Sequence, residues 1–244
     1  QTLANVLSQA GTLLSLLIVA RLLGNVQYGR FALVQSTVVA FTTVAALGLG
    51  ITATKYVSEY RSTDPRRAGR VLGLSSTVAM ISAAVFAVAY FVACPSLVGG
   101  TYSGAMQIGA ISVVFVTLNG YQLGALAGFE AFHVIACVSA LAAVANPLVT
   151  ALLTMKFGLP GAVAALGSNA FLVWAIYHFA MRAECRKRNC EVSYRDFRKE
   201  GRILLAMSAP ASLSGIIGSA AIWATTVILS RQNNGYAQLA IFSA

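Results

Sequence analysis

Two long apolar runs separated by a short polar stretch constrain the fold of this chain more than any other feature. The first run, Leu3 to Leu23, carries no charge before Arg21, and the second, Phe31 to Thr54, carries none. A helix needs about 20 residues to cross roughly 30 Å of hydrocarbon, and each run is long enough. The pair therefore predicts a helical hairpin that crosses a bilayer twice.

The overall composition agrees with a membrane protein. The chain has 244 residues, of which 58% are hydrophobic and only 10% are charged, whereas soluble domains carry about 25% charged residues. A signal peptide would show one short apolar stretch before a cleavage site, but here the first run is full length and others follow it. We therefore expect an integral membrane protein that keeps its first helix.

The apolar runs alternate with polar gaps along the whole chain and predict an all-α, polytopic transmembrane bundle. The longest and most charged gap, 182–202, suggests an N-terminal six-helix lobe at 1–181, a basic linker at 182–202 and the start of a second lobe at 203–244. The chain begins without Met and stops within a helix, so we expect a fragment of a longer polypeptide. The predicted helices are 3–23, 31–54, 71–93, 105–127, 134–155, 161–181 and 203–230, with an eighth from about Tyr236.

The positive charges predict how the helices are oriented. Of seventeen Lys and Arg residues, five lie between Lys55 and Arg70 and eight between Arg182 and Arg202, whereas four lie in the gaps of the other side. Cytoplasmic loops of membrane proteins carry such an excess, so the N-terminus is expected in the cytoplasm, in a multi-pass protein of the cytoplasmic membrane. No basic face interleaved with aromatic residues accompanies these charges, so nucleic-acid binding is not expected.

A faint internal repeat supports a second lobe. At a constant shift of 208 residues, three identities connect the loop after the first helix with the loop after the seventh. Two six-helix halves related by an axis along the membrane normal are a known transporter plan. The matching pairs are Asn25 with Asn233, Tyr28 with Tyr236 and Ala32 with Ala240.

Glycines that recur at every fourth position predict where helices pack closely. Gly120, Gly124 and Gly128 lie on one face of the predicted fourth helix, and such glycines let helix backbones approach each other in lipid. Pro147 lies in the middle of the predicted fifth helix, which it is expected to bend.

Polar side chains inside the apolar helices are the strongest functional signal, because lipid offers them no hydrogen-bond partner. On the first helix such residues, Ser15 among them, fall within an arc of about 120°, and smaller groups lie on the second and fourth helices. A hydrated substrate cavity is one interpretation, and interhelical hydrogen bonding is the other; Asn146 and Asn169 occur singly. The candidate cavity residues are Asn5, Ser8, Gln9, Thr12, Gln35, Thr42, Asn119 and Gln122.

Three other polar residues have a functional and a structural interpretation. Arg21 and Arg30 could contact an anionic headgroup, although both lie near a helix end, from which an arginine can snorkel to the interface. His178 could titrate in a coupling step or pack at the interface.

The sequence contains no catalytic or metal-binding constellation. It lacks paired carboxylates, HExxH, GxSxG and GxxxxGK motifs, and its four cysteines have no metal-ligand spacing. No Asp or Glu lies in the middle of a helix, so carboxylate-based ion coupling has no candidate here. We therefore expect neither an enzyme nor a cofactor or metal site.

Three segments together resemble the polysaccharide transporter family of the MOP flippase superfamily, the O-antigen flippase type. The first runs from Ala20 to Val34 and is followed by Leu47-Gly-Leu-Gly50 and Lys55-Tyr-Val-Ser-Glu59. The second is Phe157-Gly-Leu-Pro-Gly161-Ala-Val-Ala-Ala165, and the third runs from Asp196 to Pro210.

The resemblance implies a MATE-like transporter of two lobes around a cavity that alternates between the membrane faces. Its substrate would be an undecaprenyl-diphosphate-linked oligosaccharide, such as an O-antigen repeat unit, and its partners would include membrane lipids and other polysaccharide biosynthesis proteins. A multidrug or cation antiporter of the same superfamily is the first alternative, which would need a buried carboxylate. A membrane-embedded glycosyltransferase or polymerase is the second, which would need a long outer loop.

Overall fold

The computed structural model describes residues 2–98, 104, 107–188, 190, 192–194 and 201–243, and the side chains from residue 9 on except those at 95–98, 201–211 and 214. Within these ranges all regular structure is helical, which confirms the predicted fold class. The helices are α1 (Thr2–Ala46), α2 (Leu49–Tyr60), α3 (Pro65–Val98), α5 (Gly109–Gly128), α6 (Phe132–Phe157), α7 (Leu159–Lys187), α8 (Gly201–Ser230) and α9 (Gly235–Ser243).

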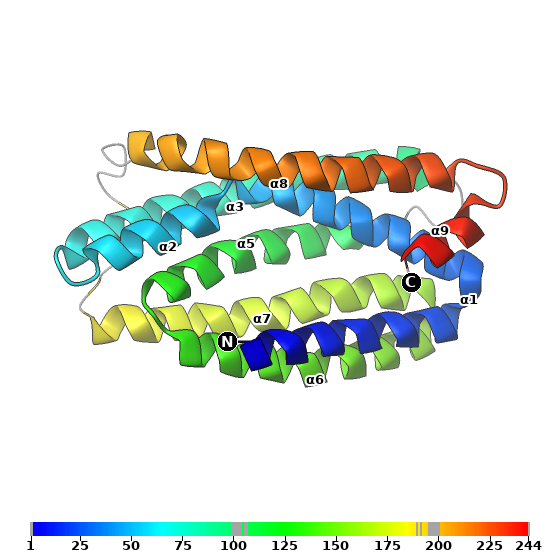
Figure 1. The fold of residues 1–244 in the computed structure, drawn as a ribbon, viewed down its shortest axis with the longest axis horizontal. Helices are drawn as coiled ribbons and strands as arrows, with labels where there is room; N and C mark the ends of the chain where they lie inside the picture. Colours follow the sequence, from blue (N-terminus) through cyan, green and yellow to red (C-terminus); the bar gives the residue numbers. More distant parts are fainter. Residues whose placement is uncertain are drawn as a thin grey trace.

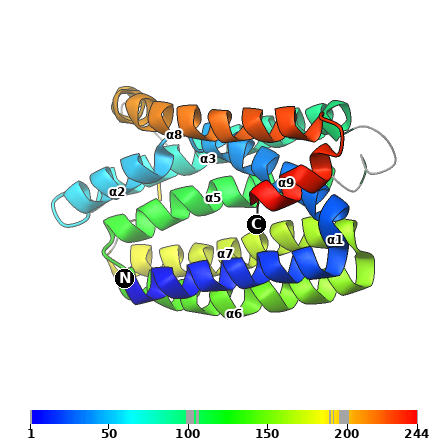
Figure 2. The ribbon, with the colours of Figure 1, turned by 45° about the vertical axis from the view of Figure 1, so that its right-hand side comes forward.

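Helix α1 is a hairpin rather than one straight helix. Gly24 has φ 71° and ψ 170°, so the helical path is interrupted there, in a backbone region that glycine tolerates and other residues avoid. Figures 1 and 2 show the two halves of α1 running back in opposite directions, in different layers. The predicted double crossing is therefore present, but the polar stretch before Phe31 is almost entirely helical and the reversal needs only one residue.

A second break divides the predicted helix 31–54. Leu47 and Gly48 have φ values of 47° and 64°, so α1 ends at Ala46 and α2 starts at Leu49 in a new direction. Helix α2 then continues to Tyr60, past the predicted end. Helices α3 and α7 also extend beyond their predicted bounds at the charged end, because Arg, Lys and Glu are good helix formers once they reach water.

The helices form two layers with α5 between them (Figure 1). One layer contains α8, α2, α3 and the second half of α1, and the other contains the first half of α1, α6 and α7. Figure 2 shows the same arrangement from another side. Both halves of α1 can therefore line a space inside the bundle together with α6 and α7.

Five helices of the described residues are long and apolar enough to cross a membrane, and the first of them, Gln9–Ala46, contains both halves of the hairpin. Large apolar side chains on their outer faces are exposed, among them Val92, Leu152 and Met155. Such a surface suits lipid, because a soluble monomer rarely exposes apolar patches of this extent. The chain is therefore a multi-pass membrane protein.

The glycine stripe of α5 is a packing surface for α2, as its spacing predicts. A Cβ added to Gly50 would lie 2.8 Å from the carbonyl oxygen of Gly120, and one added to Gly124 would overlap the Gly50 backbone. The Thr54 hydroxyl also donates to the Gly124 carbonyl at 2.9 Å. These contacts hold α2 directly against α5, so the two backbones touch without intervening side chains.

The two segments of the faint repeat lie side by side. The Tyr28 hydroxyl of α1 donates to the carbonyl of Ser243 in α9 at 3.3 Å, and Ala32 and Leu33 form a buried cluster with Leu239. The Arg30 guanidinium lies 5.3 Å from the centroid of the Tyr236 ring. Helices α1 and α9 are thus joined at the end of the bundle where Gly24 reverses the chain.

Candidate functional site

A hollow of about 120 Å³ lies between both halves of α1, α6 and α7. Its walls combine apolar side chains with three amides and three hydroxyls, and no charged residue contributes to them. We call it the polar hollow. Its lining residues are Thr12, Ser15, Leu16, Val19, Phe31, Gln35, Asn146, Thr150, Ala162, Leu166 and Asn169.

Pro147 and Gly11 explain how α1 and α6 meet beside the polar hollow. Proline has no backbone N–H, so Pro147 cannot donate to the carbonyl of Ala143 within α6. Gly11 packs against that same residue, since a Cβ added to Gly11 would lie 2.5 Å from the Ala143 carbonyl oxygen. The backbones of α1 and α6 are therefore in contact, and the larger Thr12 and Ser15 side chains that follow reach the hollow.

The hydrogen bonds around the polar hollow leave acceptors available. The Asn169 amide nitrogen donates to the Thr150 hydroxyl at 3.4 Å, while the Asn169 amide oxygen is buried without a partner. The Ser15 hydroxyl donates to the Gly11 carbonyl of its own helix at 2.9 Å. Because buried polar atoms are normally hydrogen-bonded and the hollow has room for several water molecules, these groups fit a hydrated interior.

Thr12 and Gln35 are the two predicted cavity residues that line the polar hollow. They come from opposite halves of the α1 hairpin, so the reversal at Gly24 brings them together. The side chains of Asn5 and Ser8 lie outside the described residues. Gln9 is exposed and does not belong to the lining.

The other three predicted cavity residues are placed elsewhere. The buried Thr42 hydroxyl donates to the Val38 carbonyl of its own helix at 2.8 Å. The Asn119 amide nitrogen donates to the Ala170 carbonyl at 3.0 Å and so joins α5 to α7. Gln122 lines a different hollow, nearer the charged end of the bundle.

Thr150 was not recognised from the sequence as a neighbour of the amides. The available signal was its spacing, because Asn146 and Thr150 are four residues apart and share one face of a helix. Asn169 lies on the next helix in the chain, and its contact with Thr150 depends on how α6 and α7 pack. Sequence spacing alone could therefore place Asn146 and Thr150 together, but it could not add Asn169.

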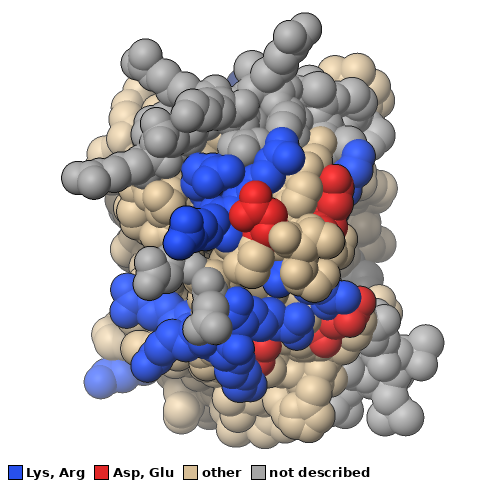
Figure 3. All heavy atoms as spheres, turned by 90° about the vertical axis from the view of Figure 1, so that its left-hand side faces the viewer, with Lys and Arg blue, Asp and Glu red and all other residues tan. Residues whose placement is uncertain are grey.

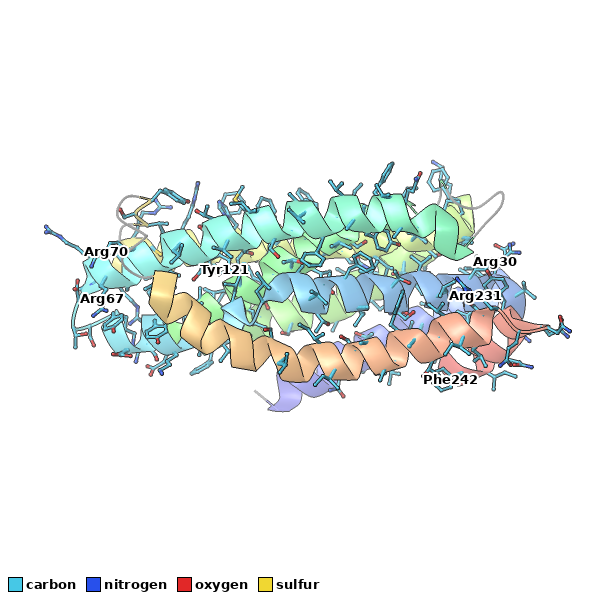
Figure 4. All side chains as sticks on the ribbon, turned by 90° about the horizontal axis from the view of Figure 1, so that it is seen from above. Arg30, Arg67, Arg70, Tyr121, Arg231 and Phe242 are labelled. Atoms are coloured by element: carbon cyan, nitrogen blue, oxygen red, sulfur yellow. The ribbon has the colours of Figure 1, made fainter. Side chains whose placement is uncertain are left out.

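The cations of the two ends are separated by the length of the bundle. Figure 4 shows Arg67 and Arg70 at one end and Arg30 and Arg231 at the other. Arg21 is exposed and Arg30 lies over the Tyr236 ring. Neither arginine lines the polar hollow, so any headgroup contact that they make lies outside it.

Figure 3 faces the first of these ends, where Lys and Arg residues cover much of the surface around fewer acidic ones. We call it the basic end. Arg61 and Glu130 form an ion pair of 2.5 Å there, which connects the loop after α2 with the turn between α5 and α6. The hydrogen bond from Arg61 lowers the pKa of the exposed Glu130 carboxyl. The charged segments around Arg61 and Arg188 thus lie at the same end of the bundle.

An apolar hollow of about 200 Å³ lies between α1, α3 and α8. Phe41 and Phe86 form one side of it and Trp223 of α8 the other. The Trp223 indole N–H donates to the Thr37 hydroxyl at 3.2 Å, which connects α8 to α1. This space suits a hydrocarbon chain better than a sugar, because its lining offers almost no hydrogen-bonding groups.

Comparisons with known proteins agree with this architecture. A solved structure described as "Inward-facing conformation of a multidrug resistance MATE family transporter of the MOP superfamily" superimposes with a TM-score of 0.80 at 17% sequence identity. The match covers 97% of this chain and 56% of that chain, so the chain spans little more than half of that transporter's length. The likeness shows the MOP transporter fold and confirms the predicted fold class.

The family comparison covers the complete sequence. A search among curated proteins found no match. A family model described as "Polysaccharide biosynthesis protein" matches residues 1–244. The chain therefore belongs to the polysaccharide biosynthesis protein family, and its multi-pass helical bundle has the fold of that MATE family transporter.

Proposed function

We propose that the protein moves a lipid-linked oligosaccharide, carried on undecaprenyl diphosphate, from the inner to the outer leaflet of the cytoplasmic membrane. The observation that carries the proposal is the combination of a whole-chain match to polysaccharide biosynthesis proteins with a transporter fold. Polysaccharides are assembled from precursors that must cross a membrane, and a transporter in such a family supplies that step.

The proposed mechanism is alternating access between two lobes, of which residues 1–181 form the first and residues from 203 on begin the second. The N-terminus lies in the cytoplasm, so the basic end faces inward, as the excess of Lys and Arg favours. The contacts of α1 with α9 at the opposite end then connect the lobes on the outer side. Transport requires these contacts to open when the outer face opens.

The chemistry of the polar hollow supports a glycan more than a cation. Its amides and hydroxyls can exchange hydrogen bonds with sugar hydroxyls, and its described lining carries no carboxylate that would attract a positive charge. At about 120 Å³ it is smaller than the roughly 300 Å³ of typical small-molecule sites. In this conformation it has room for water but not for a glycan, and we propose that it becomes one wall of a larger cavity as the lobes separate.

The apolar hollow beside α8 supports the proposal for the lipid part of the substrate. Moving a polyprenyl chain into a hydrated cavity costs free energy, because its apolar surface would leave the bilayer for water. The space between Phe41, Phe86 and Trp223 lies between α8 and the preceding helices. It offers an apolar passage for the chain while the glycan moves through the polar interior.

The test replaces two amides of the polar hollow by apolar residues of similar size. Cells that depend on the complete protein receive the Gln35→Leu/Asn169→Leu variant, and lipid-linked glycan on the outer face is measured with a membrane-impermeant lectin. We expect loss of surface glycan with normal protein levels in the membrane. Thr43→Val is the matched control, because the Thr43 hydroxyl donates only to the Val39 carbonyl of its own helix.

Two results would count against the proposal. Unchanged surface glycan in the double variant would remove the polar hollow from the pathway. Normal glycan delivery in cells that lack the protein, together with increased sensitivity to cationic drugs, would favour the multidrug antiporter alternative instead.

A further inference from the structure

A hollow of about 330 Å³ lies on the flank of the bundle toward the basic end, apart from the polar hollow. Its walls are α3 and α7, its floor is α5, and the segment at 192–194 closes one end. We call it the lateral groove. Figure 4 labels Tyr121 of its floor, in the basic half of the bundle beside α3. The residues used below are Met80, Leu118, Trp174, His178, Arg182 and Tyr194.

Specific hydrogen bonds fix the floor of the lateral groove to both walls. The Tyr121 hydroxyl donates to the Leu72 carbonyl of α3 at 3.1 Å. With its amide oriented to satisfy both partners, Gln122 accepts from the Trp174 indole N–H at 3.3 Å and donates to the Trp174 carbonyl at 3.2 Å. These polar groups of α5 are thus engaged with the two walls, and the polar groups at the rim remain to meet a ligand.

The cation at the rim, Arg182, differs from Lys187 and Arg188 at the end of the same helix, which share one carboxylate. The Glu184 carboxylate accepts from the Lys187 ammonium at 2.8 Å and lies 3.7 Å from the Arg188 guanidinium. Among the described residues Arg182 has no acidic partner, although it lines the groove. The exposed Arg182 guanidinium and the Tyr194 hydroxyl, which line the same groove, are hydrogen-bond donors of the kind that bind a phosphate group.

The lining changes along the groove from charged to apolar. Arg182 and Tyr194 lie at the basic end, the stacked rings of Trp174 and His178 follow at a centroid distance of 5.3 Å, and Leu118 and Met80 continue the surface into the membrane region. Met80 is 62% exposed. A phospholipid has the same order of chemistry, with an anionic phosphate at the surface and a hydrocarbon chain below it.

The wall at 192–194 also belongs to the segment that connects the two proposed lobes. The Ser193 N–H donates to the Gly69 carbonyl of α3 at 3.1 Å, and a Cβ added to Gly73 would overlap the Ser193 backbone. Tyr194, which follows directly, is 64% exposed. A molecule in the groove would therefore contact α3, α5 and α7 of the first lobe and the connecting segment together.

We propose that the lateral groove binds an anionic phospholipid of the leaflet at the basic end. Its phosphate accepts hydrogen bonds from the Arg182 guanidinium and the Tyr194 hydroxyl, and one acyl chain lies over Leu118 and Met80. The bound lipid stabilises the position of the segment at 192–194 against α3. The anionic lipid content of the membrane then regulates how freely the segment between the lobes moves.

The test measures lipid binding to the complete protein in detergent by native mass spectrometry, with phosphatidylglycerol and phosphatidylcholine as probes. Arg182→Gln is expected to weaken phosphatidylglycerol binding about fivefold, as for one cation near a membrane surface. Met80→Trp, which fills the apolar part, is expected to weaken it as well. Arg186→Gln is the matched control, because it removes one exposed cation from the same helix outside the groove.

Equal losses in Arg182→Gln and Arg186→Gln would overturn the proposal in favour of diffuse attraction to the basic end. Equal retention of both lipids by the unmodified protein would overturn it too. Glycerophosphoglycerol, the headgroup without chains, is expected not to displace the lipid; displacement would indicate a site for a soluble phosphate ester. No glycan is present in this assay, so its outcome is independent of the proposed transport of lipid-linked oligosaccharide.

Discussion

Replacement of Gly29 by alanine should separate α1 from α9. A Cβ at position 29 would overlap the Tyr236 carbonyl oxygen and lie 2.7 Å from the carbonyl carbon, whereas non-bonded carbons prefer about 3.5–4.0 Å. The two backbones must therefore move apart by about 1 Å, because neither obstacle is a flexible side chain. Overpacking of this kind costs about 1–3 kcal/mol.

The higher helix propensity of alanine does not offset this cost, because it stabilises α1 equally whether that end is open or closed. Even the lower value, about 1 kcal/mol, shifts a two-state equilibrium roughly fivefold. The shift favours conformations in which the end with Gly24 is open, because the Arg30–Tyr236 and Tyr28–Ser243 contacts connect α1 and α9 at that end in this structure.

Distances between spin labels at Val26 and Phe242, both exposed on these helices, directly measure the population in which the end with Gly24 is open. In Gly29→Ala we expect a larger fraction of molecules at the longer distance, and slower glycan transport. Gly120→Ala is the control, because Gly120 is helical and an added Cβ there would meet nothing within 4 Å. An unchanged distance distribution in Gly29→Ala would refute the assigned contact between α1 and α9.

Three further outcomes are expected. Gly124→Ala should lower the melting temperature of the detergent-solubilised protein, because the new Cβ overlaps the Gly50 backbone at a cost of about 1–3 kcal/mol, of which the helix propensity of alanine offsets about 1 kcal/mol; an unchanged melting temperature would contradict that packing. Tyr121→Phe should cost about 1 kcal/mol in chemical unfolding through the lost bond to a carbonyl of α3, and a neutral result would argue against that bond. Because Arg61 lowers the folded-state pKa of Glu130, the ion pair stabilises the protein above the ordinary carboxyl pKa and ceases to do so as the pH falls through the lowered value. Melting curves of Glu130→Gln and the unmodified protein should therefore differ at pH 7 and converge in acid, and a constant difference would exclude the pair as its cause.

Much of the fold could be predicted from hydrophobic length alone. Runs of about 20 apolar residues admit few structures in a bilayer, so the order of the helices followed from them, although the predicted helix 31–54 is divided at Leu47 and Gly48. Their ends were less accurate, because charged residues extend helices into water. The reversal was predicted as a loop of several residues, yet a single glycine with positive φ accomplishes it.

The candidate site was harder to predict, because a polar face of one helix does not reveal its neighbour. Thr12 and Gln35 reach the polar hollow, but Asn119 donates to a carbonyl of α7 instead. Lining a hollow and hydrogen bonding to a neighbouring helix are both expected for buried polar groups in lipid. The packing of the helices decides which of the two occurs, and the packing of α6 against α7 places Asn169 beside the hollow.

The transport of lipid-linked oligosaccharide by the purified, complete protein tests the central proposal most directly. Proteoliposomes would carry the lipid-linked glycan in both leaflets, and an impermeant glycosidase outside would cleave the glycan that it reaches. We predict that cleavage exceeds half of the total at a rate set by the amount of protein, and that liposomes without protein stop near one half. Cleavage that stops near one half in both preparations would contradict the account.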